Sequence, residues 1–203
     1  VPHGHDPKVH HADGRTSEHD FCFVGTGYPS RIAEFERVNW HGARVAFAGN
    51  WPSVTPDSPL HRFLLDNPNN CYDNADTAAL YRASDMSANL YRREANASAS
   101  AEGWAVGPRE IELAACGTFF ARHSRGEGDG LFPMLPTIGS ADELGDVIAW
   151  SLAHPDQRQA AADGARAAVV AFFFDAIHDE LDLIFAAQGA HAVAIAVWRA
   201  FLQ

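Results

Sequence analysis

Lysine, cysteine and long apolar runs are all scarce in this 203-residue sequence. Lys8 is the only lysine, so nearly all of the positive charge is arginine, which binds phosphate bidentately but is also typical of proteins from GC-rich genomes. The three cysteines, Cys22, Cys71 and Cys116, are odd in number and widely separated, with no C-x-x-C pair. They argue against a disulfide framework or a structural zinc site. Each lies in an apolar run, where we expect a buried free thiol.

No apolar run is long enough to cross a membrane. The longest, residues 167–174, is far shorter than the roughly 20 residues that span a bilayer. No basic segment precedes an apolar one near the start, as it does in a signal peptide. We therefore expect a cytoplasmic protein without a membrane span. Because the chain begins at Val1 rather than methionine, we expect it to be processed or part of a longer protein.

The chain is acidic and has enough apolar residues for a core. Its 15 Lys+Arg against 26 Asp+Glu give a net charge of −11, and 47% of the residues are hydrophobic. This apolar fraction excludes disorder over the whole chain. The negative charge argues against a nucleic-acid binder that neutralises many phosphates. A local anion site is still allowed, since it needs only one or two well-placed cations.

Apolar runs alternate with segments of helical spacing along most of the chain. We expect strands at residues 21–24, 43–48, 71–72, 86–91 and 118–121. We expect helices capped by Ser30, Asp76 and Ser140, and others over residues 109–116 and 156–174, with two further segments split by Gly189. The polar stretches 50–59, 92–107 and 122–130 are expected to be loops. The alternation predicts an α/β fold with a doubly wound parallel sheet flanked by helices.

The first expected strand ends in a glycine turn. In a doubly wound sheet, ligands bind at the carboxyl ends of the strands near the switch point. Gly25-Thr26-Gly27 is similar to a phosphate-binding turn, but taken alone it is better interpreted as an ordinary tight turn. Arg31, in the first turn of the next helix, either contacts a phosphate or is a solvated helix residue. The third glycine of G-x-G-x-x-G is replaced by Ser30, which argues against an NAD-dependent oxidoreductase.

Residues 107–117 are the most informative stretch. Glu110 and Glu112 point to different sides of the expected helix, whose other residues are mainly small or apolar. A glutamate on such a helix needs a partner or a ligand, and a vicinal diol such as a ribose offers two hydroxyl donors to one carboxylate. Arg109 adds positive charge to a helix N-terminus that already favours anions. The alternative is a capping glutamate paired with arginine.

The order of these motifs resembles the C-terminal half of a GT-B glycosyltransferase, closest to the spore-maturation-type, family-1-like transferases. The resemblance covers most of residues 5–170 and implies a Rossmann-like core, whereas the tail after Phe174 does not look like the usual ending of the family. We expect a single domain 1–203 that consists of an entry segment 1–19, a core 20–174 and a tail 175–203 of extra C-terminal helices. The segments that carry it are His5–His10, Phe23–Gly25, Val45–Gly49, Leu80–Ser84, Asn89–Arg92, Arg109–Glu112, Ala115–Gly117, Glu143-Leu144, His154-Pro155 and Arg158.

The resemblance implies a nucleotide-sugar donor, such as a UDP-sugar, as the substrate, with no further cofactor and no bound metal. Glu112 matches the glutamate that holds the donor ribose, and Arg109 and Arg31 match contacts to its phosphates. Asn74 falls in the nucleobase loop. The donor-binding residues are then expected to be Gly25, Thr26, Arg31, Asn74, Arg109 and Glu112.

The family places its acceptor site, and often its catalytic base, in an N-terminal domain that is missing from this chain. No catalytic residue is therefore named, and the acceptor is unknown. Trp104 stands where many related transferases have a glutamate that contacts the donor sugar. A non-catalytic nucleotide-binding or assembly module with the same fold is the alternative to a transferase.

Three other features have simpler interpretations. Five histidines within the first twenty residues invite a metal site, but a solvated entry segment is favoured because ligand partners at helical spacing are lacking. Asp129 is expected in a loop turn. Trp40 is expected to pack in the core, whereas Trp51 and Trp104 are left open between packing and stacking on a ligand.

Overall fold

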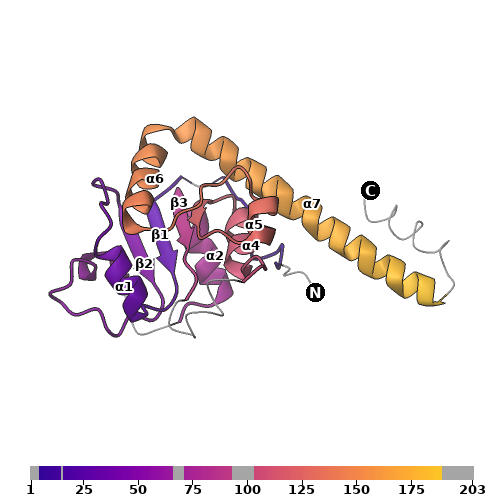
Figure 1. Ribbon diagram of the computed structural model, residues 1–203, viewed down its shortest axis with the longest axis horizontal. Coiled ribbons are helices and arrows are strands. Elements are labelled where there is room, and N and C mark those ends of the chain that lie inside the picture. Colours follow the sequence, from indigo (N-terminus) through magenta and orange to yellow (C-terminus); the bar gives the residue numbers. More distant parts are fainter. Residues whose placement is uncertain (1–4, 15, 66–70, 93–102, 189–203) are drawn as a thin grey trace.

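The computed structural model describes residues 5–14, 16–65, 71–92 and 103–188. Its centre is a parallel sheet of four strands in the order β2-β1-β3-β4 (Figure 1). Each strand has four residues and is almost entirely buried, as expected for a sheet covered on both faces. The strands are β1 (Phe21–Val24), β2 (Val45–Ala48), β3 (Met86–Asn89) and β4 (Phe119–Arg122).

Helices cover both faces of this sheet. On one face, the Phe21 and Phe23 rings of β1 contact Phe35 of α1. On the other face, α2 packs against β1 and α4. The long α7 packs on α4 and continues beyond the sheet (Figure 1). The helices are α1 (Pro29–Phe35), the 3-10 helix η1 (His61–Phe63), α2 (Asn74–Arg82), α4 (Pro108–Cys116), α5 (Gly126–Leu131), α6 (Ala141–Ala153) and α7 (Pro155–Gln188). The predicted doubly wound α/β class is confirmed.

Aromatic rings fill the core on the α1 side of the sheet. Phe47 and Trp51 stack with ring centres 5.0 Å apart, and Trp40 contacts Phe21 at 5.2 Å. Trp51 is fully buried and its indole N–H donates to the Ala48 carbonyl at 2.9 Å. The predicted packing role of Trp40 is confirmed, and Trp51 packs in the core as well.

Two helix starts differ from the predictions. The N-cap of α1 is Tyr28, and Ser30 lies inside the helix because Pro29 fits its first position. The N-cap of α2 is Asp73, whose side chain accepts a hydrogen bond from the Asp76 N–H at 2.8 Å. Asp76 is therefore within the first turn rather than before it.

The predicted strand at Cys71-Tyr72 is wrong. These residues form no strand, and Cys71 is exposed while Cys22 and Cys116 are buried. Two residues are too few to form a sheet ladder, and the following Asp73 commits the chain to a helix cap instead.

The predicted loop over residues 122–130 is also wrong, since Arg122 ends β4 and α5 begins at Gly126. Three glycines lower the helix propensity of this stretch, but Asp129 is held on α5 by Arg122 at 2.6 Å. A tertiary ion pair thus overrides local propensity.

The C-terminal helix is longer than predicted. It runs without a break through residue 174 to Gln188, whereas Gly189 lies outside the described residues. Most of the expected loop 92–107, residues 93–102, also lies outside them. His10 is 4% exposed rather than solvated, because the entry segment packs on the body, where Arg82 donates to the Val9 carbonyl.

The strongest local signals give correct boundaries. The helix predicted between Pro108 and Gly117 is observed as α4, with Gly117 in the left-handed conformation at φ 74°. Ser140 caps α6 by accepting from the Glu143 N–H at 3.2 Å.

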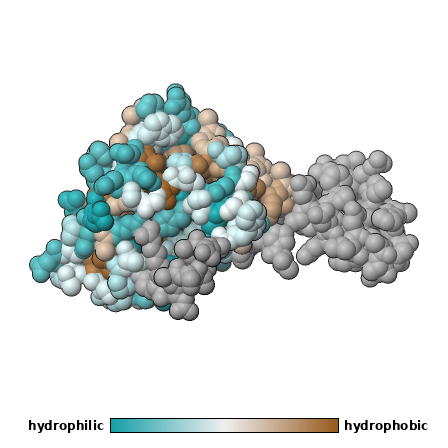
Figure 2. All heavy atoms as spheres, in the orientation of Figure 1, coloured by the Kyte–Doolittle hydropathy of each residue, from teal (hydrophilic) through white to brown (hydrophobic). Residues whose placement is uncertain are grey.

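The surface on the face drawn in Figure 2 is mainly hydrophilic, with apolar patches between polar areas. Within the described part of the chain, no helix has the length and apolarity needed to cross a membrane.

Candidate functional site

The switch point of the sheet lies between β1 and β3, because the chain leaves β1 towards β2 on one side and reaches β3 on the other. Arg31 of α1 connects the two strand ends there. Its Nη1 donates to the Thr26 carbonyl at 2.6 Å and its Nη2 to the Leu90 carbonyl at 2.7 Å. At 7% exposure, Arg31 joins these strand ends from inside the protein, at the place where a doubly wound sheet has its ligand crevice.

Gly25 makes room for Arg109 at this crevice. A Cβ atom at Gly25 would lie 3.0 Å from Nη2 of Arg109 and 3.1 Å from the Phe23 ring. The Arg109 guanidinium lies 5.1 Å from the centre of the Phe23 ring. Within the described part of the chain, no carboxylate forms an ion pair with Arg109. Its charge therefore lies beside the glycine turn, at the N-terminus of α4, without an ion-pair partner among the residues that the structure describes.

Glu112 follows Arg109 by three residues, so both lie on the same side of α4. It is partly buried, and no described residue forms a hydrogen bond or ion pair with its carboxylate. Burial raises the pKa of Tyr81. The positive charge of Arg109 opposes this rise and the negative charge of Glu112 adds to it, so both groups act on the same buried hydroxyl. The two groups are thus close together and differ in sign.

The six predicted donor-binding residues fall into two sets. Gly25, Thr26, Arg31 and Arg109 meet at the crevice, with Glu112 one turn further along α4. Asn74 is the exposed first residue of α2. Donor binding by all six stays a prediction.

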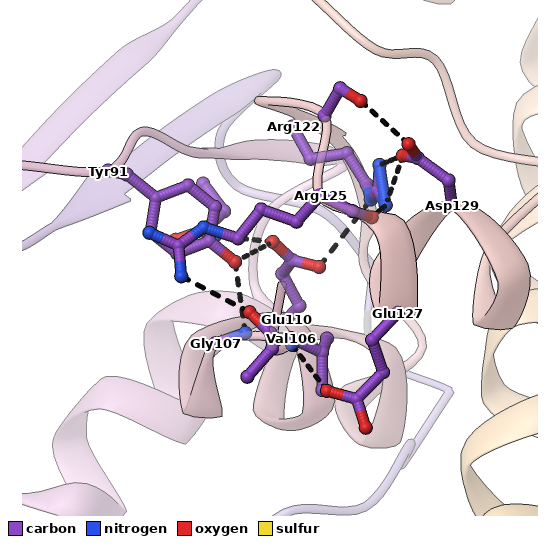
Figure 3. A network of polar contacts seen from close by, with 11 residues as sticks. Tyr91, Val106, Gly107, Glu110, Arg122, Arg125, Glu127 and Asp129 are labelled. Atoms are coloured by element: carbon purple, nitrogen blue, oxygen red, sulfur yellow. Dashed lines mark hydrogen bonds and ion pairs between the residues drawn. The ribbon is translucent and has the colours of Figure 1, made fainter. Parts of the chain in front are cut away.

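Glu110, rather than Glu112, is the fully buried carboxylate of α4 (Figure 3). Its Oε1 accepts from Asn89 Nδ2 at 2.6 Å and from the Tyr91 hydroxyl at 2.7 Å. The Tyr91 oxygen in turn accepts from the Gly107 N–H, at the N-cap of α4, at 3.0 Å. Burial, followed by the negative charge of Glu110, raises the pKa of Tyr91 and keeps its hydroxyl a donor.

Arg122, at the end of β4, supplies the charge that balances Glu110. It is fully buried, with Nε 3.5 Å from Glu110 and its terminal nitrogens 2.6 and 2.8 Å from Asp129. The Ser124 hydroxyl donates to the other Asp129 oxygen at 2.6 Å. This network joins β3, β4, α4 and α5 and fixes the start of α4, where Arg109 lies.

Sequence reasoning named Glu110 but not this network. The available signal was a glutamate between apolar helix residues, which requires a partner but does not say which one. Tyr91, Arg122 and Asp129 are far from Glu110 in sequence or on other elements, so only the fold identifies them.

No metal centre is found in the described ranges, where no three His, Cys, Asp or Glu side chains gather around a possible ion.

Comparison with solved structures places the fold among GT-B glycosyltransferases. Sucrose-phosphate synthase from Thermosynechococcus elongatus is 15% identical, with a TM-score of 0.65 over 93% of this chain and 52% of that chain. Anabaena Alr3699/HepE in complex with UDP-glucose is 14% identical, with a TM-score of 0.55 over 88% of this chain and 56% of that one. The chain thus spans about half the length of these two proteins.

A third structure covers a single domain. The C-terminal domain of a glycosyl transferase group 1 family protein (LpcC) from Francisella tularensis is 12% identical, with a TM-score of 0.55 over 84% of this chain and 98% of that one. No curated protein matches the sequence. Residues 15–174, more than half of the chain, match the model of one protein family. The chain belongs to the glycosyl transferase-like family.

Proposed function

We propose that the chain is the donor-binding half of a glycosyltransferase and binds a UDP-sugar at the crevice between β1 and β3. The observation that carries this proposal is the Arg109 guanidinium. It lies beside Gly25 at the N-terminus of α4, and no carboxylate in the described part of the chain pairs with it. Burying part of a cation without a counter-ion costs free energy, which a bound anion offsets.

Each part of the donor has a matching group. The diphosphate accepts hydrogen bonds from Arg109, assisted by the positive end of the α4 dipole and by the inner charge of Arg31. The ribose hydroxyls donate to the carboxylate of Glu112, which lies one turn along the same helix. Gly25 and Thr26 form the wall next to the phosphates, and Asn74 lies next to the nucleobase.

The finer identity rests on the same residues. We place the chain in the spore-maturation-type branch, as a hexosyltransferase of the cytoplasm that needs no cofactor besides its donor substrate. The acceptor site and catalytic base belong to an N-terminal domain that the chain does not include, as its coverage of about half of two solved relatives supports. UDP is the favoured nucleotide because one similar structure contains UDP-glucose.

Calorimetry with UDP tests the donor assignment. Each charge-assisted hydrogen bond contributes about 1.5–3 kcal/mol, so Glu112→Ala should weaken UDP binding at least about ten-fold. Glu18→Ala, which removes an exposed carboxylate elsewhere, is the matched control and should bind like the wild type. Unchanged affinity in Glu112→Ala would remove the ribose assignment.

A non-catalytic nucleotide-binding module is the second candidate. The observation in its favour is Trp104, which is 71% exposed and rests against Gly126 at the position where a sugar-contacting glutamate is expected. A tryptophan cannot accept hydrogen bonds from sugar hydroxyls. Turnover of any member of a UDP-sugar panel by the full-length protein would eliminate this candidate.

A further inference from the structure

Two aromatic rings at the crevice are each contacted by two guanidinium groups. The centre of the Phe23 ring lies 5.1 Å from the Arg109 guanidinium and 4.9 Å from that of Arg31. The centre of the Tyr28 ring lies 5.4 Å from the Arg31 guanidinium and 4.2 Å from that of Arg92. Apart from Arg62 over Phe63, all cation-π pairs among the described residues lie at this crevice or next to it.

Such a cluster is unusual in a chain with a net charge of −11. Elsewhere in the described part of the molecule, several arginines pair with carboxylates, as Arg44 does with Asp20 and Arg158 with Asp85. Like charges placed close together repel each other, and the rings offset only part of this cost. The arrangement therefore favours anions in the crevice.

The donor diphosphate does not account for all of these cations. A UDP-sugar carries two phosphate charges, which Arg109 and the inner charge of Arg31 match. Arg31 already donates to two carbonyls, and Arg125 donates to the Ala105 carbonyl at 3.3 Å. Arg92 is exposed, and no carboxylate among the described residues pairs with it. Arg92 is therefore the cation that the donor diphosphate does not account for.

The Tyr28 ring orients Arg92 without occupying its donors. A guanidinium stacked on a ring keeps its N–H groups in the plane, pointing outward, where they match the two oxygens of a carboxylate or phosphate. Tyr28 is fixed by its position as N-cap of α1, and Arg92 follows β3, so the two face each other across the switch point. This pair has the form of an anion-recognition element.

We propose that the crevice recognises a second anionic group besides the donor diphosphate, and that Arg92 stacked on Tyr28 binds it. The inference rests on the proposed donor site and specifies its substrates: either the donor sugar carries a carboxylate or the acceptor carries a phosphate. Both sources present the same chemistry, an oxyanion with two acceptor oxygens.

Two titrations separate these sources. The first compares UDP-glucuronate with UDP-glucose on the 203-residue chain. The second compares glucose 6-phosphate with glucose on the full-length protein, with its acceptor domain, saturated with UDP. In one of the two ligand pairs, we expect the anionic ligand to bind about ten-fold more tightly than the neutral one. One charge-assisted bidentate contact is sufficient for a difference of this size. The pair that shows the preference identifies the source.

Variants assign the effect to Arg92. Arg92→Gln should abolish the preference while leaving UDP-glucose affinity unchanged. Tyr28→Ala should abolish the preference as well, and because its ring also contacts Arg31, only the ratio within each pair is compared for it. Tyr28→Phe should retain the preference. Arg37→Gln removes an exposed arginine just past the opposite end of α1 and should behave like the wild type. A lack of preference in both pairs, or a preference that survives Arg92→Gln, overturns the inference while UDP binding still supports the donor site. Absence of UDP binding overturns both.

Discussion

Arginines at the two ends of the sheet have different kinds of partner. At the amino ends of the strands, Arg82 pairs with Asp13 at 3.0 Å, Arg158 with Asp85 at 3.1 Å, and Arg44 with Asp20. At the carboxyl ends, Arg109 and Arg92 stack on rings, and neither has a carboxylate partner among the described residues. The first end is internally neutralised, whereas the second presents positive charge.

Arg122 refines this contrast because it lies at the carboxyl end and yet is fully paired, with Glu110 and Asp129. Burial separates the two kinds of arginine more sharply than position does. A fully buried guanidinium needs carboxylates of its own protein, whereas a partly exposed one can be neutralised by a ligand. Arg122 is therefore expected to matter for stability, and Arg109 for binding.

The largest expected effect is on folding. Arg122→Met leaves Glu110 buried without its cation, and removing one partner of a buried pair costs about 3–5 kcal/mol in free energy of unfolding. Arg109→Met should change this free energy by less than about 1 kcal/mol. Urea denaturation followed by circular dichroism measures both, and equal losses in the two variants would contradict the distinction.

The next effect is on binding. Arg109→Gln removes the charge beside Gly25, and the loss of a charge-assisted contact of about 1.5–3 kcal/mol should weaken UDP binding roughly 10- to 100-fold. Its urea midpoint should stay near that of the wild type. Arg166→Gln, an exposed substitution on α7, serves as control for the change in net charge. Full UDP affinity in Arg109→Gln would refute the anion site.

Gly49 and Gly25 lie next to each other in space, and substitutions at the two positions should separate effects on stability from effects on binding. Gly49 has φ 103°, and a Cβ atom there would lie 2.4 Å from the Gly25 carbonyl oxygen, so Gly49→Ala should cost at least about 1–3 kcal/mol. In Gly25→Ala, the new methyl group meets the flexible end of Arg109 at 3.0 Å and the buried Phe23 ring at 3.1 Å, but no backbone atom as close as in Gly49→Ala. We expect this variant to lose less stability than Gly49→Ala and to bind UDP less tightly than the wild type. Calorimetry and urea melts on the same samples compare them.

The smallest effect belongs to the amino end. Burial raises the pKa of Asp20, but the hydrogen bonds and charge of Arg44 outweigh this and hold it below its usual value. The pair therefore stabilises the fold above the unfolded-state pKa of Asp, about 3.9, and this contribution is lost as the pH falls through the lower folded pKa.

Because the Arg44 side chain is 56% exposed, Asp20→Asn should cost less than about 1 kcal/mol at pH 7. The difference from the wild type should shrink between pH 5 and pH 3, as followed by thermal melts. A difference that grows on acidification would show that Asp20 does not titrate as inferred.

Local signals were sufficient for most of the elements. The buried runs at residues 21–24 and 86–89, the Pro108–Gly117 bracket and the Ser140 cap all predicted structure that is observed. They failed at Cys71-Tyr72, where an adjacent cap decided the conformation, and at residues 126–131, where an ion pair did. The apolar pattern at Cys71-Tyr72 does not show that the next residue will cap a helix, and helix propensity at residues 126–131 does not include the ion pair to the end of β4.

The sequence alone determined the fold class and drew attention to Arg109 and Glu112, because alternation of strands and helices and a charged helix start are local properties. Only the tertiary structure decided how the arginines divide their roles. Arg31 meets Leu90 across 59 residues, Glu110 is buried against Asn89 and Arg122, and Arg92 stacks on Tyr28. These contacts follow from the packing of parallel strand ends around one switch point, which brings together residues that no sequence spacing relates.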